Sequence, residues 1–534
     1  MDQEDLRGLI EMESFIPVLT PIIGLVGAIL LALLSVTHKS RRAADTIFLS
    51  TTIVTAVMTG YVAYTVLRFN ETLVYGSGGW LPPLGIVYVV DKLSATMALL
   101  SSLIIFLIAV YSIGYFGGRE HGIHYMYILV LLMSSALIGI YYTGDLFNFF
   151  VMIELMAVTA YALVGYHKNK GEAVEAALKY GMIACLAGIL LFLGIGFIYA
   201  YIGTLSIPDL SAKILGLPTP MNLFSGNTVV AAAPLLLIVG LIVWSLMLES
   251  AAFPLHFWLP DAHSEAPSPV SALLSGLVVN AGLYGLIRLF YTVLSWGRHA
   301  VGGLSVVLDV LVVLGCLGAL YASVMMLIET DIKRIIAYST VMHVSLIIIG
   351  ISIGTRYALA ASIYHFITHS ISKALAFLSV GVLVSAAGTR NIRDLKGFAK
   401  LYPGASAGMI IAMLGLAGVP PLGTFPSKLL LIAASVGAGN IGAALIIIIT
   451  SAIAAIGYFR IINLLVNEAP VKTGVLRPGW TVKASITILC ILVVVVGLAL
   501  PLLSQLSTSV SGQLFSPTDY IGSVRGIIER FLTH

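Results

Sequence analysis

The chain has 534 residues, of which 59% are hydrophobic and only 10% are charged. Soluble domains carry roughly 25% charged residues, so this composition indicates an integral membrane protein. The net charge of +4 is small and the basic residues are scattered, which argues against nucleic-acid binding. The three cysteines lie far apart in apolar stretches, without the Cys/His spacing of a zinc, haem or iron–sulfur site, so no cofactor is expected.

Apolar runs of about 17–25 residues predict roughly 14 transmembrane helices. In chain order they are residues 15–36, 46–67, 93–116, 124–142, 145–166, 174–202, 231–258, 268–291, 304–327, 332–352, 357–385, 404–437, 440–466 and 483–505. No soluble domain fits between them. The predicted fold is therefore an all-α polytopic membrane protein.

The basic residues also predict how these helices are oriented. Lysine and arginine are concentrated in the loops on one side, beginning with Lys39, Arg41 and Arg42. Because cytoplasmic loops carry an excess of basic residues, this side is predicted to face inward. The chain is then a multi-pass protein of the cell membrane with both termini on the outer face.

Two of the predicted helices contain their own breakers. Pro254 interrupts residues 231–258, and Pro420 and Pro421 interrupt residues 404–437. A broken helix at membrane depth is tolerated where it is packed in protein or lines a wet cavity. Each broken helix is the fourth member of a five-helix block, and odd-numbered blocks in tandem insert with opposite topology. The predicted units are three helices in residues 1–121, inverted repeats in 122–300 and 301–470, and a last helix with a short tail in 471–534.

Two acids are placed within predicted helices. Glu154 lies in the middle of DLFNFFVMIELMAVTAYALVGY, and Glu249 comes just before Pro254. A carboxylate at the bilayer centre costs a few kcal/mol or more, so it is rarely there without a function. If the two carboxyls approach each other, they would share a proton or a cation such as sodium. The structural alternatives are a neutralising partner for Glu154, and a helix cap or a contact with Lys179 for Glu249.

Basic groups mark the second block. His365, His369 and Lys373 are four residues apart, so they form one stripe on a helix and predict a proton relay. Metal binding by the two histidines lacks an obvious third ligand. Lys428 lies just beyond Pro420 and Pro421, which predicts a place in the ion path rather than at a helix end where its side chain would snorkel.

Three further polar residues have two open interpretations. His256 follows the first break and either relays a proton or hydrogen-bonds backbone groups freed by Pro254. Lys179 and His343 belong either to the ion path or to structural polar contacts.

The remaining charged residues near helix ends receive structural interpretations. A solvated loop end is predicted for Asp261, His263 and Glu265, and interfacial anchoring for Arg288 and Arg460. Helix N-termini, where the helix dipole favours an acid, are predicted for Asp145 and Asp331.

Six sequence motifs carry a family resemblance over about residues 75–470. They are WLPPLGI with VDKLSA, DLFNFFVMIEL, FPLHFWLPDAHSEAPSPVSALLSG, DIKRIIAYSTVMHVSL, HFITHSISKALAFL and GLAGVPPLGTFPSKLLL. In this order they resemble the proton-antiporter family. Its members are the L, M and N membrane subunits of NADH–quinone oxidoreductase, the A and D subunits of the Mrp sodium/proton antiporters, and relatives in membrane-bound hydrogenases. The short tail favours a subunit of the D, M or N type, and within the family the chain most resembles the D-type subunits of the Mrp antiporters.

The resemblance assigns roles to the residues that match its motifs. It implies that Glu154 is the family's fifth-helix glutamate and Lys428 its twelfth-helix lysine or glutamate. His365, His369 and Lys373 match the eleventh-helix relay. Two positions depart from the family pattern: Glu249 stands in place of the usual seventh-helix lysine, and Asn280 in place of an eighth-helix bridging lysine.

The resemblance also implies that the chain works with other membrane subunits in a multisubunit respiratory or antiporter complex. It would move protons or sodium ions and hold no redox or catalytic centre of its own. Because Glu249 and Asn280 replace lysines, a second hypothesis is a structural paralogue with an impaired first half-channel that serves as a scaffold. A stand-alone carrier of a small solute is a third, since inverted repeats occur there too.

Overall fold

A computed structural model describes residues 3–37, 40–80, 85–117, 122–217, 232–295, 303–467 and 478–532. Helices account for most of these residues. The all-α prediction misses one small element, an antiparallel two-stranded sheet of β1 (Leu73–Gly76) and β2 (Val87–Val90). The predicted unit boundaries at residues 121, 300 and 470 lie outside the described residues, so the division into units stays a prediction.

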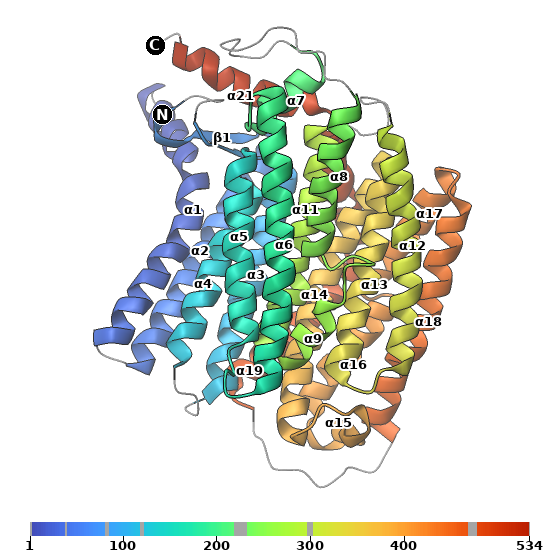
Figure 1. The fold of residues 1–534 in the computed structure, drawn as a ribbon. Helices are drawn as coiled ribbons and strands as arrows, with labels where there is room; N and C mark the ends of the chain where they lie inside the picture. The colour runs from blue at the N-terminus through green and yellow to red at the C-terminus, as the bar shows by residue number, and fades with distance from the viewer. Residues whose placement is uncertain are drawn as a thin grey trace.

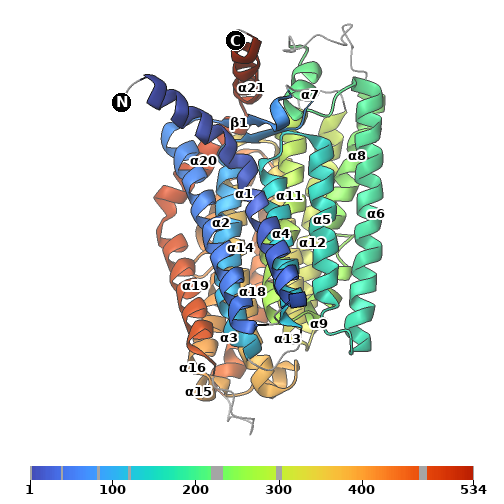
Figure 2. The ribbon, with the colours of Figure 1, turned by 90° about the vertical axis from the view of Figure 1, so that its left-hand side faces the viewer.

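The first part of the chain supplies six long helices on one side of the bundle (Figures 1 and 2). Helix α1 packs on α4, α2 on α3, and α5 lies between α4 and α6. The carboxylate of Asp145 accepts a hydrogen bond from the backbone amide of Asn148 at 2.8 Å, so the predicted acid at the start of α5 is confirmed. The six are α1 (Gln3–Thr37), α2 (Arg41–Phe69), α3 (Lys92–Phe116), α4 (Ile123–Tyr142), α5 (Leu146–Val164) and α6 (Gly171–Ile202).

The next part holds the first helix break and a long irregular span. The short helix α7 (Ile207–Ile214) precedes α8 (Ala232–Glu249), and α9 (Trp258–Glu265) follows the break. The span that comes next alternates between α-helical and π-helical turns, an irregularity frequent at functional sites. It consists of α10 (Ser268–Leu273), a π segment (Leu274–Val278), α11 (Val279–Ile287) and a second π segment (Arg288–Val293).

The second half contains the other broken helix. Helix α12 packs on α13 and α18, and α14 packs on α13, α16, α17 and α20. Asp331 caps α13 by accepting from the Lys333 amide at 2.8 Å, as predicted. The helices are α12 (Leu304–Ile328), α13 (Ile332–Ile353), α14 (Arg356–Ala387), α15 (Phe398–Leu401), α16 (Pro403–Ala417), α17 (Thr424–Gly437), α18 (Ile441–Asn467), α19 (Trp480–Leu498), α20 (Leu500–Leu514) and α21 (Pro517–Leu532), with a 3-10 turn at Ile392–Leu395.

Within the described residues, twelve helices are long and apolar enough to cross a membrane. The other two predicted spans, 231–258 and 404–437, are occupied by the shorter helices α8, α16 and α17. The breaks therefore lie where the prolines predict them. The count of 14 and the inverted relation of the two blocks stay predictions.

The bundle has a buried centre and an apolar outside. The span Ser268–Val293 and helix α13 are buried along their whole apolar windows, and α14 nearly so. Helices α1, α2, α6, α12 and α18 expose apolar side chains outward, as helices facing lipid or partner subunits do. The beginning of α1, the short helix α7 and α21 lie at one end of the bundle (Figures 1 and 2). This end is called the terminal end below.

Candidate functional site

The first break places an acid at an unfavourable point of the fold. Helix α8 ends at Glu249, which is 2% exposed and has no hydrogen-bond partner on either carboxylate oxygen. The C-terminal end of a helix carries partial negative charge, so it repels a carboxylate. The Leu248 carbonyl beside it is already satisfied by the indole nitrogen of Trp258, at 3.2 Å. Glu249 therefore needs a proton or a cation to be stable there.

A second acid interacts with Glu249 across helices. Glu154, in the middle of α5, is half-buried, and its Oε1 atom has no hydrogen-bond partner. Its carboxyl lies against Gly188 of α6, where any side chain would collide with it. Close by, the Ser245 hydroxyl of α8 donates to the Ala187 carbonyl at 2.7 Å. The two carboxyls lie close enough to interact electrostatically, which is the condition under which they could share a proton or a cation.

Tyr180 adds a group that the sequence pattern did not single out. Its ring stacks on Trp258 with centroids 4.0 Å apart, and its buried hydroxyl has no hydrogen-bond partner. This hydroxyl interacts electrostatically with Glu249. Among the described residues, no three His, Cys, Asp or Glu side chains meet as a metal site. A cation at the acid pair would therefore need hydroxyl, backbone or water oxygens as further ligands.

His256 faces the second half of the molecule. Its ring lies 5.6 Å from the Phe253 ring and 4.9 Å from the Tyr321 ring of α12. It also hydrogen-bonds the backbone of Pro254, and its Nδ1 atom has no partner. Both interpretations of His256 therefore stay open.

Lys179 belongs to an ion-pair network at the end of the bundle opposite the termini. Its ammonium is half-exposed and pairs with Glu175 at 2.8 Å and Asp261 at 3.1 Å. Asp261 also accepts from Arg334 of α13 at 2.5 Å. Burial would raise the pKa of Asp261, but the hydrogen bonds from Arg334 and Lys179 hold this pKa below its usual value. The network ties α6, α9 and α13 together, so Lys179 lies outside the group formed by the acid pair.

The predicted solvated loop end at residues 261–265 is wrong in part. His263 is fully buried, and its ring stacks on Phe377 of α14 with centroids 4.7 Å apart. Glu265 pairs with Arg390 at 2.7 Å. These residues lie in α9, which continues the broken helix back into the bundle, and the sequence alone did not show that continuation.

Asn280 links the two halves without a charge. It lies in α11 between the two π segments and is fully buried. Its amide nitrogen donates to the Ser370 hydroxyl of α14 at 2.7 Å and to the Gly276 carbonyl at 2.5 Å. The bridging position therefore holds a neutral hydrogen bond to the relay helix.

The second break places its cation at a favourable point. Lys428 lies in the first turns of α17, and its ammonium donates to the carbonyls of Leu416 at 2.8 Å and Ala417 at 3.2 Å. These are the last carbonyls of α16, and cations are stabilised at the C-terminal end of a helix. Lys428 is thus satisfied by the break that carries it, in contrast to Glu249.

A continuous hydrogen-bonded chain runs through the second half, and we call it the relay chain. His365 contacts Ser427 of α17 at 2.8 Å and His343 of α13 at 2.9 Å. The other nitrogen of His343 contacts the Tyr458 hydroxyl of α18 at 3.2 Å. The relay chain comprises six fully buried side chains in the order Ser427, His365, His343, Tyr458, Ser339 and Lys373.

The relay chain differs from the predicted stripe. The Tyr458 hydroxyl meets that of Ser339 at 2.5 Å, and Ser339 bonds the Lys373 ammonium, which also donates to the Ile336 carbonyl at 2.8 Å. His369 has no hydrogen-bond partner on either ring nitrogen and lies beside the chain, with its ring 5.4 Å from that of His343. Ser339 and His343 are four residues apart in α13, a spacing that could have suggested a shared face.

The structure tests the predicted interfacial anchors Arg288 and Arg460, and it contradicts the prediction only for Arg288. Arg288 is buried and binds both carboxylate oxygens of Asp91, at 2.5 and 2.6 Å, with a further bond to Tyr284 at 2.8 Å. Arg460 donates to the carbonyls of Leu327, at 2.5 Å, and Glu329 at the end of α12. Arg288 is therefore an internal ion pair that joins α3 to the irregular span, and the prediction for it is wrong.

The fold and these polar groups together define a polytopic membrane protein of the ion-transport class, with two broken helices and titratable side chains at each. Residues 143–454 match the sequence profile of the NADH:quinone oxidoreductase/Mrp antiporter transmembrane family. The chain belongs to this family.

Individual relatives agree with this assignment. The chain is 33% identical to the N subunit of NADH-quinone oxidoreductase from Desulforudis audaxviator, over 74% of this chain and 76% of the relative. It is 30% identical to the D subunit of the Na(+)/H(+) antiporter from Alkalihalophilus pseudofirmus, over 87% and 90%. A chain of the membrane-bound sulfane sulfur reductase, an archaeal respiratory membrane complex, superposes with a TM-score of 0.86 and 27% identity, covering 95% of this chain and 99% of that one. The protein is therefore an antiporter-like membrane subunit of the type found in such complexes.

Proposed function

We propose that this subunit moves protons through its second half, along the relay chain, within a multisubunit membrane complex. The observation that carries the proposal is the unbroken connection of six buried side chains from α13, α14, α17 and α18. Hydroxyl and imidazole groups can both accept and donate a proton, so a proton can pass along such a chain without a mobile carrier.

Two ammonium groups act on the relay chain. Lys373 ends it, and Lys428 interacts electrostatically with His365, His343 and Lys373. In a low-dielectric interior, like charges repel over several ångströms. We infer that a proton gained by one lysine favours release from the other, which gives the chain a direction when a neighbouring subunit changes the charge at one end.

The relay chain is tested by removing the Tyr458 hydroxyl while keeping the ring. Tyr458→Phe breaks the contacts to His343 and Ser339, so proton uptake by vesicles that hold the assembled complex should fall by about 10²-fold, the scale of a lost proton-transfer group. The matched control is Tyr364→Phe, because the Tyr364 hydroxyl is also buried in this half but donates to the Val496 carbonyl outside the relay chain. Equal uptake in the two variants would contradict the proposal.

For the first half, we propose that Glu154 and Glu249 share a proton or a sodium ion. The unpartnered oxygens of Glu249 at the negative end of α8, beside a second acid, support this proposal. The competing hypothesis is a scaffold subunit without transport of its own, and the neutral Asn280 favours it for the first half. Glu249→Lys combined with Asn280→Lys separates the two hypotheses. Coupled transport should change if the first half takes part and stay constant if neighbouring subunits do all of it.

We also propose how the chain is divided into repeats and how it is oriented in the membrane. Residues 122–300 and 301–470 would be inverted repeats, since each contains one broken helix in the same position of its block. We place the protein in the cell membrane with the terminal end outward. Thiol labelling of single cysteines introduced at Lys400 and at Asp519, in a chain without its native cysteines, tests this orientation.

A further inference from the structure

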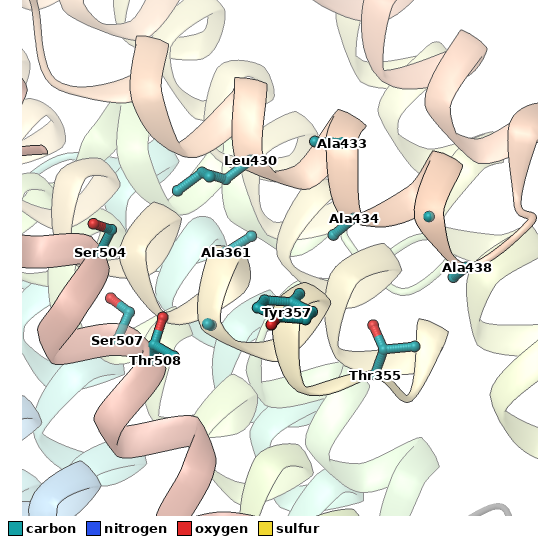
Figure 3. A pocket seen from close by; sticks show the side chains of 12 residues that line it. Thr355, Tyr357, Ala361, Leu430, Ala433, Ala434, Ala438, Ser504, Ser507 and Thr508 are labelled. Atoms are coloured by element: carbon teal, nitrogen blue, oxygen red, sulfur yellow. The ribbon is translucent and has the colours of Figure 1, made fainter. Parts of the chain in front are cut away.

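A groove opens between α14, α17 and α20 near the terminal end. It has a volume of about 440 Å³ and is lined mostly by small and apolar side chains (Figure 3). Helix α17 contributes Leu430, Ala433 and Ala434, and α14 contributes Ala361 and Tyr357. Tyr357 is 74% exposed, and aromatic side chains of this kind are enriched where a membrane meets water.

One polar side chain in this groove has no partner in the protein. Ser507 of α20 lines the groove and is 1% exposed, yet its hydroxyl forms no hydrogen bond (Figure 3). The hydroxyl of Ser504, one turn earlier, is already bonded to the Pro501 carbonyl at 3.1 Å. A buried hydroxyl without a partner is costly, so a ligand with an acceptor group would satisfy Ser507.

A polar pocket of about 690 Å³ adjoins the groove across α20. Thr508 lines the groove, while Ser509 and Gly512 line the pocket. Arg356 connects the two spaces. It lies between two groove residues in the sequence, donates to the Thr508 carbonyl at 3.3 Å, and packs its guanidinium against Gly512.

Among the described residues that line this pocket, two are cations and one is an acid. Lys92 donates to the Ser509 hydroxyl at 2.7 Å, and both Lys92 and Arg356 keep donors that these bonds leave unused. The acid in the lining is Asp519 of α21. The surplus of positive charge, with a guanidinium and an ammonium on one pocket, suits the oxygens of a phosphate diester.

We propose that the groove and the polar pocket together bind one anionic phospholipid. An acyl chain lies against Leu430 and Ala433, an ester oxygen meets Ser507, and the phosphate rests on Arg356 and Lys92. A partner helix fits less well, because a helix with its side chains is about 10–12 Å across and about one turn of it would fill this volume. The lipid would keep α14 and α17, which carry His365 and Ser427, at a fixed spacing.

Binding is measured on the purified complex, as phosphatidylglycerol retained per copy after detergent washing, by quantitative mass spectrometry. The parent should keep one phosphatidylglycerol. Arg356→Gln removes the phosphate contact, so it should lower the retained lipid by about tenfold or more, the factor for one lost charge-assisted hydrogen bond. Ala433→Phe fills the groove, so it should also lower the retained lipid by steric exclusion of the acyl chain. Arg68→Gln and Ala452→Phe are matched controls, because both side chains are exposed outside the groove.

Further experiments distinguish a bound phospholipid from a free phosphate ion and from a partner subunit. Vesicles of phosphatidylglycerol, but not of phosphatidylcholine, should restore the lipid to a delipidated parent, and excess inorganic phosphate should not displace it. Displacement by phosphate would show a free-anion site, and loss of lipid in Arg356→Gln but not in Ala433→Phe would show that the acyl chain lies outside the groove. Either result would overturn the proposal. The proposal would also be overturned if Ala433→Phe, or the milder Ala433→Leu, released a partner subunit while the complex kept the lipid, because the groove would then bind that subunit. A parent that retains no phospholipid would overturn it as well.

Discussion

The two halves of this protein use the same device, a broken membrane helix with a charged residue, in opposite ways. In the first half, the acid Glu249 lies at the negative end of α8 beside Glu154, and its oxygens have no protein partner. In the second half, the cation Lys428 caps the carbonyls that α16 leaves open, and the relay chain runs next to it. The helix dipole opposes the first arrangement and stabilises the second. This difference supports the proposal that the first break holds an ion and that the second passes protons.

The largest effect is expected at the second break. Lys428→Ala removes the ammonium that caps α16 and acts on the relay chain, so proton uptake by the assembled complex should fall by about 10²-fold or more. Lys400→Ala, at an exposed lysine of α15, is the control. Unchanged proton uptake in Lys428→Ala would show that protons do not pass through the second half.

The next prediction concerns the thermal stability that sodium gives to the complex through the first half. If the acid pair holds sodium, sodium chloride should raise the thermal unfolding temperature of the complex above its value in choline chloride. A site filled at about 100 times its dissociation constant adds about 2.7 kcal/mol. Glu249→Gln should abolish this difference, and Glu172→Gln, at an exposed acid of α6, should keep it. A sodium response that survives in Glu249→Gln would place the ion elsewhere.

The neutral link between the halves should matter for stability more than for transport. Asn280→Ala removes the hydrogen bond to Ser370, so we expect a loss of about 1–2 kcal/mol in unfolding free energy. Because no charge is lost, proton uptake should stay within about twofold of the parent. This change is small beside the roughly 10²-fold loss expected when a proton-transfer group is removed. Uptake that fell as far as in Lys428→Ala would show that Asn280 is part of the path.

The smallest effect concerns the ion-pair network that joins the halves. Asp261 has a pKa below its usual value, so its pairs with Arg334 and Lys179 add stability above about pH 4 and lose it as the pH falls through the folded-state pKa. Asp261→Asn should lower the unfolding free energy at pH 7 by about 1 kcal/mol, since these groups are partly exposed to screening solvent. The difference from the parent should stay nearly constant down to about pH 4 and shrink as the pH falls below 4, through the folded-state pKa of Asp261. A constant difference would mean that the ion pairs are not its source.

The sequence predicted the parts of this comparison that depend on local signals. Pro254 predicted the first break, Pro420 and Pro421 predicted the second, and apolar length predicted the long helices. Mid-helix charges marked Glu154, Glu249 and Lys428 as candidates. The structure places Glu249 and Lys428 at those breaks, and Glu154 lies in the middle of α5, where it interacts with Glu249.

The contacts between helices could not be predicted in the same way. Tyr458 looks like an ordinary aromatic residue of an apolar helix, and it becomes part of the relay chain only because α18 packs beside α13. Arg288 resembles an anchor at a helix end, but its partner Asp91 lies 197 residues away in the sequence. The prediction for His263 was wrong for a similar reason, since its burial depends on α14. These features follow from which helix faces meet.

The central claim is that protons pass through the second half independently of the first. It is tested most directly by comparing Lys373→Met with Glu154→Gln in proton uptake by the same reconstituted complex. Lys373 ends the relay chain, so its replacement should abolish uptake, whereas Glu154→Gln should leave most of it. Abolished uptake in Glu154→Gln together with normal uptake in Lys373→Met would contradict the account.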